Sequence, residues 1–483
     1  MIKTINWENI LIFFWLCILV SINSNYSGAI ELQNINNISF FSQTNFFTLL
    51  NFIRFFIPYI LLPILIIVFF SVPIKKPNVF ITTFAIFWCF QLFAFFISNR
   101  HLESLETFPE PALVGSTSIL EYEISLFTSL NLIFSSLSIL LIISIAKNLN
   151  LKEFNKKILI VTLCFVGLIS VYFTFNIISE TIENNLKFAY WTNTLHPMEL
   201  TMGQANPRIT GISRMILIFY LLFFCFLLNN NKKIIWYIIL IILGLVIYKM
   251  QARGSLIGII TLYFIFFVFC NLNFRKKIVI FFILIAIPIL SFEIYYYKIK
   301  PGFDKINVDK INVDKINVQP KNRFLLIESS SGRNLIWDKA ILVIKEKKIL
   351  LGYGPQADRF LLTQLKKNKN KEQFFREKYG INYLFDSNVS NSFLYAYLCS
   401  GIIGILLLIF IYLLAIKKVL KNIFIKKIFL YKNILKNFST ITLVYLGFRG
   451  LFENSFSVFG IDYIFFILTY LISENSEYSS QKI

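Results

Sequence analysis

Residues 392–416 read SFLYAYLCSGIIGILLLIFIYLLAI and contain no charged side chain. A helix needs about 20 apolar residues to cross the ~30 Å hydrocarbon core of a bilayer, so this run is long enough to span one. The whole chain has the same character: it is 57% hydrophobic and only 15% charged, whereas a soluble domain has roughly 25% charged residues. We therefore expect a membrane protein without a separate soluble enzyme domain.

Apolar runs of similar length recur along the chain. A backbone in lipid must satisfy its hydrogen bonds internally, so each run should be a helix. We predict an all-α polytopic membrane protein with about twelve transmembrane helices. The spans are expected near residues 9–22, 53–72, 79–98, 123–146, 157–178, 210–229, 233–250, 254–272, 277–297, 392–416, 437–455 and 457–473.

The first of these runs is short, and Ser27-Gly28-Ala29 follows it. A cleaved signal peptide and a retained helix are both compatible with such a start. We favour the retained helix, because no clear small-x-small cleavage site lies directly after the apolar core.

The formal net charge is +21, which in a soluble protein would suggest nucleic-acid binding. In a membrane protein the positive-inside rule explains it, because Lys and Arg concentrate in cytoplasmic loops. Alternate connections are basic here, whereas the connection at 101–123 is acidic. The basic ones contain Lys75 and Lys76, Lys147 to Lys157, Lys232 and Lys233, Arg275 to Lys277, and Lys417 to Lys436. This alternation predicts that both termini are cytoplasmic, and nucleic acid is not an expected partner.

Cysteine and histidine usage argues against a metal centre. None of the six cysteines belongs to a Cys-x-x-Cys pair, and all lie inside apolar runs. The two histidines, His101 and His196, are far apart in sequence, so an imidazole-based metal site is not expected. We predict neither a metal nor another cofactor.

One long connection, residues 298–391, divides the chain into helices at 1–297, this loop, and helices with a short tail at 392–483. The alternation of charge places the loop on the outer side of the membrane, facing the periplasm or the exterior. Loops of this length are usually functional or disordered. Residues 304–318 repeat Asp-Lys-Ile-Asn-Val three times, and we interpret them as a tolerated tandem insertion without a site.

The rest of the loop has helical patterning. Residues 329–332, Ser-Ser-Ser-Gly, can cap a helix. An amphipathic helix is then predicted, because apolar residues follow at i, i+3, i+4 and i+7. These residues are Trp337, Ala340, Ile341 and Ile344. Gly352, Gly354 and Pro355 then predict a turn. Such a helix could lie on the membrane surface and cover a cavity.

Ionisable residues at membrane depth cost about 2.5–3.5 kcal/mol each and are therefore functional candidates. Those at the predicted outer ends are Arg208 and Arg214 at the sixth span, Arg253 at the eighth, Arg333 at the loop helix, and Arg449 with Glu453 in the eleventh. Two simpler readings stay open: a terminal Arg can snorkel to the interface, and Arg449 with Glu453, four residues apart, can form a structural pair.

Two of these arginines have neighbours that suit anion binding. Gly254 and Ser255 follow Arg253 and allow close approach of a ligand. Arg333 is expected at a helix N-terminus, where backbone donors already favour an anion. Guanidinium groups bind phosphate oxygens bidentately. The pattern points to a pyrophosphate-bearing lipid, bound either by an enzyme or by a flippase; a transporter should also show paired inverted repeats, which this sequence lacks.

The order of four motifs resembles one known family. Residues 251–258, Gln-Ala-Arg-Gly-Ser-Leu-Ile-Gly, are similar to a Ser-Arg-Gly helix start, and 332–354 to an Arg-x-x-x-Trp helix followed by Gly-x-Gly. Residues 391–404 are similar to a His-Asn-x-x-Leu segment followed by Gly-Ile-x-Gly, and Arg-Gly-Leu-Phe-Glu closes the series at 449–453. This order, over roughly residues 200–475, resembles the O-antigen ligase and O-antigen polymerase superfamily of bacterial membrane glycosyltransferases.

The resemblance implies a GT-C-like helical bundle in the bacterial inner membrane. Its partners would be membrane lipids and an undecaprenyl-pyrophosphate-linked oligosaccharide, with a chain-length regulator as a further candidate. In this reading Arg253 and Arg333 hold the pyrophosphate during catalysis. The expected substrate-binding residues are Arg208, Arg214, Trp337, Asn391, Arg449 and Glu453.

One position departs from the family pattern. Where the family's ligases carry a His proposed to activate the acceptor, this chain has Ser390, and a serine hydroxyl cannot act as a general base near neutral pH. We keep Ser390 and Asp386 as candidate catalytic residues, and Asp386, Asp358 and His196 as alternative bases. The departure favours a polymerase over a ligase that transfers glycan to lipid A core or to protein.

Overall fold

The computed structural model describes residues 6–22, 46–75, 77–98, 126–183, 209–229, 233–249, 253–294, 333–347, 349–366, 389, 391–425, 429, 433–452 and 461–475. Within these ranges every regular element is a helix, and no strand occurs. The elements run α1 (Trp7–Ile22), α3 (Phe46–Ser71), α4 (Val79–Ile97), α7 (Leu126–Asn148), α8 (Phe154–Glu183), α10 (Ile209–Asn229), α11 (Lys233–Lys249), α12 (Arg253–Phe269), α13 (Phe274–Phe281), η4 (Phe282–Ala286), α14 (Ile287–Ile294), α16 (Arg333–Lys347), α17 (Ala357–Lys366), α19 (Ser392–Leu420), η6 (Lys421–Ile425), α20 (Ile434–Phe452) and α21 (Ile461–Asn475).

The helices coincide with the apolar runs. Each expected span overlaps one of them, and 277–297 falls on α13, η4 and α14 together. Among the described residues, five helical segments are long and apolar enough to cross a membrane: Val79–Ile97, Leu130–Asn148, Phe154–Val171, Ile212–Asn229 and Ser392–Phe424. Shorter apolar helices lie at Trp7–Ser21, Phe56–Ser71, Ile234–Tyr248 and Gly254–Phe269. The described part of the chain is thus all helical and has the apolar helices of a multi-pass membrane protein, while the number of about twelve spans stays a prediction.

Aromatic packing and interhelical hydrogen bonds hold the bundle together, as expected where lipid provides no hydrophobic drive between helices. The clearest example joins α4 to α21. The rings of Phe80 and Tyr470 stack with centroids 3.6 Å apart, and Trp88 Nε1 donates to Tyr463 Oη at 2.9 Å. The Trp88–Tyr463 hydrogen bond joins residues that are 375 positions apart in the sequence, so these contacts fix α21 against a helix from the start of the chain.

Polar contacts identify one end of the bundle. Lys157 Nζ donates to Glu8 Oε2 at 2.8 Å, which joins the starts of α8 and α1. Asn78 Nδ2 donates to Glu474 Oε2 at 2.7 Å, which joins the start of α4 to the end of α21. We call this the lysine end, because it includes Lys157 and also Lys75, whose backbone N–H donates to Asn148 Oδ1 at 3.2 Å.

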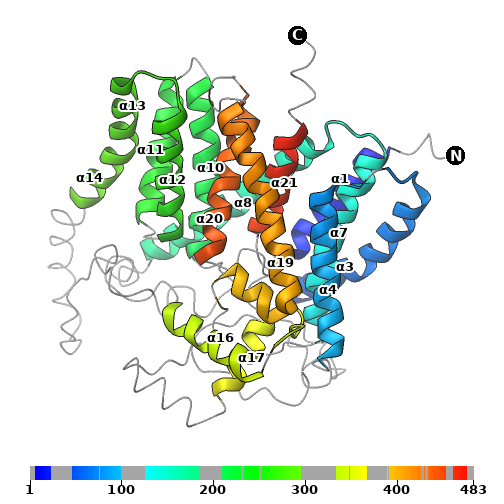
Figure 1. Ribbon diagram of the computed structural model, residues 1–483. Coiled ribbons are helices and arrows are strands. Elements are labelled where there is room, and N and C mark those ends of the chain that lie inside the picture. The colour runs from blue at the N-terminus through cyan, green and yellow to red at the C-terminus, as the bar shows by residue number, and fades with distance from the viewer. Residues whose placement is uncertain are drawn as a thin grey trace.

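Helices α16 and α17 lie at the opposite end, in yellow and green in Figure 1. They build a small second core with the start of α19, in which Ala340 and Val343 are buried beside Phe360. Trp337 and Ile344 pack against it as expected. Ile341 was expected on the same face but is 42% exposed, while Val343 is 2% exposed. The predicted apolar stripe therefore packs on this core only in part, because contact with α17 and α19, and not spacing within α16 alone, selects the buried residues.

Helix α19 is broken at Gly401, whose φ of 60° and ψ of −150° are non-helical. The break removes the helical partners of nearby backbone groups, and the turn after α16 replaces them. Tyr353 N donates to Leu398 O at 2.9 Å and Gly354 N donates to Cys399 O at 2.8 Å. Ile402 N donates to Leu350 O at 3.2 Å. The predicted Gly-x-Gly turn therefore completes the hydrogen bonding of a broken membrane helix.

Glycine is required on both sides of this junction. A Cβ on Gly352, at φ +87°, would overlap the backbone of Cys399 and Ser400, and one on Gly401 would overlap Leu350. Both residues occupy the left-handed half of the φ range, which L side chains rarely adopt. The Gly-x-Gly turn at 352–354 and Gly401 thus lie against each other in a single contact.

Candidate anion site

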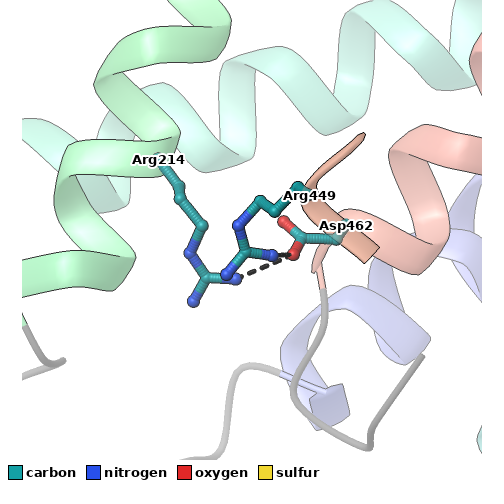
Figure 2. A network of polar contacts seen from close by, with 3 residues as sticks. All are labelled: Arg214, Arg449 and Asp462. Atoms are coloured by element: carbon teal, nitrogen blue, oxygen red, sulfur yellow. Dashed lines mark hydrogen bonds and ion pairs between the residues drawn. The ribbon is translucent and has the colours of Figure 1, made fainter. Parts of the chain in front are cut away.

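Three charged residues from three helices meet at the end opposite the lysine end (Figure 2). Asp462, in the first turn of α21, is 1% exposed. Its Oδ2 accepts from Arg214 Nη1 of α10 at 2.9 Å and also from Arg449 Nη1 of α20. Arg449 is 8% exposed in its side chain and Arg214 22%. We call these three residues the arginine centre.

The start of α12 lies beside the arginine centre. The position of a Cβ on Gly254 is 3.9 Å from Arg449 Nε, an ordinary van der Waals distance. One residue further, Ser213 Oγ of α10 donates to Ser255 Oγ at 2.7 Å in a buried contact. Ser213 directly precedes Arg214, so this hydrogen bond ties the two expected outer motifs together. Arg253 opens α12 at the same place, although its side chain lies outside the described part of the chain.

Asn391 connects the end of α20, close to Arg449, to the start of α19. Its Oδ1 accepts from the backbone N–H groups of Phe393 and Leu394, both at 2.9 Å, and so caps α19. Its Nδ2 donates to Leu451 O at 2.8 Å, two residues beyond Arg449. Asn391 was expected to bind substrate. In the structure its side-chain amide joins the start of α19 to the end of α20, which is a structural function.

Two side chains of the loop helices hold Val389, which lies two residues before that cap. Trp337 Nε1 of α16 donates to Val389 O at 3.0 Å. The N–H of Val389 donates to Asp358 Oδ2 of α17 at 3.0 Å. Asp358 is 1% exposed, so its carboxylate is committed to a buried backbone contact and is a poor candidate for the general base. Ser390 lies between Val389 and Asn391, each of which is fixed by side-chain hydrogen bonds.

The remaining expected residues are placed only in part. Arg333 opens α16, but its side chain is outside the described residues. Arg208, Glu453, Asp386, Ser390 and the alternative base His196 also lie outside them. The expected pair of Arg449 with Glu453 therefore stays a prediction, while the partner that the structure gives Arg449 is Asp462.

Sequence reasoning missed Asp462. A signal existed, because it is an isolated carboxylate in the last apolar run, 457–473, and such residues are functional candidates by default. In the arginine centre two guanidinium groups bind one carboxylate oxygen, and guanidinium groups bind phosphate oxygens with the same donors. Among the described residues no three His, Cys, Asp or Glu side chains gather as metal ligands would.

The arrangement around α12, α16 and α19 can now be compared with known proteins. Residues 238–409 match the family model described as O-antigen ligase. This match supports the O-antigen polymerase and ligase superfamily, and with it a membrane glycosyltransferase-like enzyme. No curated protein and no solved structure matches the chain.

The O-antigen ligase match runs from α11 into α19 and so includes the loop helices and the glycine junction. It contains Arg253, Arg333, Trp337 and Asn391. The arginine centre lies outside it, at Arg214 on one side and at Arg449 and Asp462 on the other. Tertiary packing therefore adds charged residues from both flanks to the matched segment.

Proposed function

We propose that the protein polymerises glycan repeat units carried on undecaprenyl pyrophosphate, at the outer face of the bacterial inner membrane. The observation that carries this proposal is the arginine centre, placed beside the start of α12 and joined through Asn391 to the start of α19. The guanidinium groups that bind the Asp462 carboxylate can bind the oxygens of a phosphate with the same N–H donors. The end opposite the lysine end is the periplasmic one under the positive-inside rule.

The reaction is a displacement at the sugar. A hydroxyl oxygen of the acceptor glycan attacks the anomeric carbon of the donor, and the bond from that carbon to the pyrophosphate oxygen breaks. The lipid pyrophosphate leaves with the electron pair, while the hydroxyl proton passes to a base, for which Asp386 and His196 are our candidates. Guanidinium groups aimed at the leaving group stabilise its growing charge without a metal. Arg253 and Arg333 complete this site in our proposal.

The second candidate function is ligation of the finished glycan to lipid A core or to a protein. The description of the matching family as O-antigen ligase favours it. The serine at position 390, in place of the histidine that the resemblance implies for ligases, favours polymerisation. Both functions use the same lipid-linked donor and differ in the acceptor.

Deletion of the gene, followed by gel analysis of the surface glycan, separates the two. A polymerase mutant loses the ladder but keeps one repeat unit on the acceptor. A ligase mutant loses all glycan from the acceptor and accumulates lipid-linked polymer. An unchanged glycan pattern would exclude both functions.

Complementation with point variants tests the site itself. Arg214→Gln and Arg449→Gln should each fail to restore the glycan. Lys157→Gln is the matched control, because it also breaks an ion pair between helices, but at the lysine end. It should restore the wild-type pattern.

A further inference from the structure

Asp462 has an unusual position for a residue beside a proposed phosphate site. It is almost completely buried, and one of its oxygens accepts hydrogen bonds from two guanidinium groups that belong to different helices. Phosphate and carboxylate oxygens accept the same N–H donors of arginine. Asp462 and a phosphate ligand therefore compete for the same groups.

The two arginines differ in how accessible they are. Arg449 is 8% exposed and Arg214 is 22% exposed in the side chain. A ligand that arrives from outside the bundle thus reaches Arg214 more easily. Arg449 is buried with Asp462, and breaking such a buried pair is costly. Arg214 is the group that can change partner while Arg449 keeps Asp462.

We propose that Asp462 is an internal anion that occupies Arg214 between reaction cycles and yields it to the diphosphate of the lipid-linked donor. This inference rests on the proposed function and extends it to product release. When the glycan has been transferred, the carboxylate competes with the lipid pyrophosphate for Arg214 and speeds its departure. Asp462 weakens diphosphate binding and in return keeps the site from being blocked by product.

The test measures binding of geranyl pyrophosphate and geranyl phosphate to the purified full-length protein in detergent. Asp462→Asn keeps the shape of the side chain and removes its charge. Its Kd for geranyl pyrophosphate should fall at least about tenfold, because a competing charge a few Å from Arg214 has been removed. The Kd for geranyl phosphate should fall by a smaller factor. A folded Asp462→Asn protein that binds geranyl pyrophosphate equally or more weakly overturns the inference.

Loss of Asp462 leaves Arg449 without that counter-ion, so the single variant can fail to fold. A second comparison, of Arg214→Gln with the double variant Arg214→Gln/Asp462→Asn, whose net charge equals that of the wild type, keeps the test decisive. Arg214→Gln should weaken binding at least about tenfold, and adding Asp462→Asn should restore part of it, because the repulsion between the Asp462 carboxylate and the diphosphate is then removed. If Asp462 only positions the arginines, the result should be the opposite: the double variant should bind geranyl pyrophosphate more weakly than Arg214→Gln does.

The outcomes also separate this inference from the proposed function. Suppose that wild-type protein binds geranyl pyrophosphate, but that Asp462→Asn binds it no more tightly than wild type and the double variant no more tightly than Arg214→Gln. The inference then fails and the proposed function stands. If neither wild-type protein nor any variant binds it, both fail. Lys157→Gln, at the other end of the bundle, should bind as wild type does.

Discussion

Trp337 donates from its indole Nε1 to the carbonyl oxygen of Val389, at 3.0 Å, across 52 residues of sequence. Asp358 accepts from the N–H of the same residue. Both polar groups of one backbone residue are thus held by side chains of the loop helices, immediately before Ser390 and the Asn391 cap of α19. The loop helices therefore control how α19 begins, beside the end of α20 that carries Arg449.

Removing this contact should loosen the junction without abolishing the fold. Trp337→Phe keeps most of the ring and deletes the donor, so it should cost about 0.5–1.5 kcal/mol of stability. Trp337→Ala also loses packing against the second core and should cost several times more, about 3–5 kcal/mol. Thermal unfolding of the purified protein measures both. Equal losses for the two variants would contradict the role given to the indole N–H.

Asp358→Asn separates a structural carboxylate from a catalytic one. The amide oxygen can still accept from Val389 N–H, so the variant should fold, with a loss of about 1–3 kcal/mol from the weaker hydrogen bond. Glycan synthesis should persist at a reduced level. A well-folded Asp358→Asn protein with no detectable synthesis would return Asp358 to the list of candidate bases.

Gly401→Ala should prevent correct folding. The methyl group would overlap Leu350, and the backbone conformation, at φ 60° and ψ −150°, is nearly exclusive to glycine. Gly447→Ala in α20 is the matched control, because its Cβ would be 4.0 Å from the nearest atom, in the ring of Tyr412. Fluorescence-detected size-exclusion chromatography should show aggregation or loss of protein for Gly401→Ala and a normal peak for Gly447→Ala.

Two glycines one turn apart on α12 should respond differently to alanine. A Cβ on Gly258 would clash with Leu217 of α10 and approach Tyr445 of α20 at 2.9 Å, whereas one on Gly254 meets only Arg449 Nε at 3.9 Å. Overpacking typically costs about 1–3 kcal/mol, so Gly258→Ala should lower the unfolding temperature. Gly254→Ala should leave it near the wild-type value. The reverse order would mean that α10, α12 and α20 pack differently.

The buried hydrogen bond between Ser213 and Ser255 can be measured by a double-mutant cycle. Ser213→Ala, Ser255→Ala and the double variant should give a coupling energy of about 0.6 kcal/mol, the average for interhelical polar contacts in membranes. The double variant should be more stable than the sum of the two single losses predicts. A coupling near zero would show that the hydroxyl groups do not interact in the folded protein.

Much of the fold follows from local sequence. A long apolar run is expected to form a helix in lipid, because a helix satisfies its own backbone hydrogen bonds. The helices accordingly coincide with the expected spans. The turn at Gly352 and Gly354 was predicted for a similar local reason. Helix α17 was not predicted, since its ten residues, Ala357–Lys366, combine apolar and polar side chains without a long apolar run.

The partners of the charged residues depend instead on packing over long sequence distances. Periodicity pairs Arg449 with Glu453, four residues away on one helix, but only the packing of α20 on α21 and α10 brings Asp462 to Arg449 and Arg214, the latter 248 residues from Asp462. Likewise, the spacing of α16 predicts an apolar face but not its rotation, which contact with α17 and α19 selects. Hydrophobicity and backbone hydrogen bonding act locally, so their effects can be predicted from the sequence. Which buried charges meet is decided by the folded bundle, because a charge in an apolar interior is stable only beside a partner that the fold delivers.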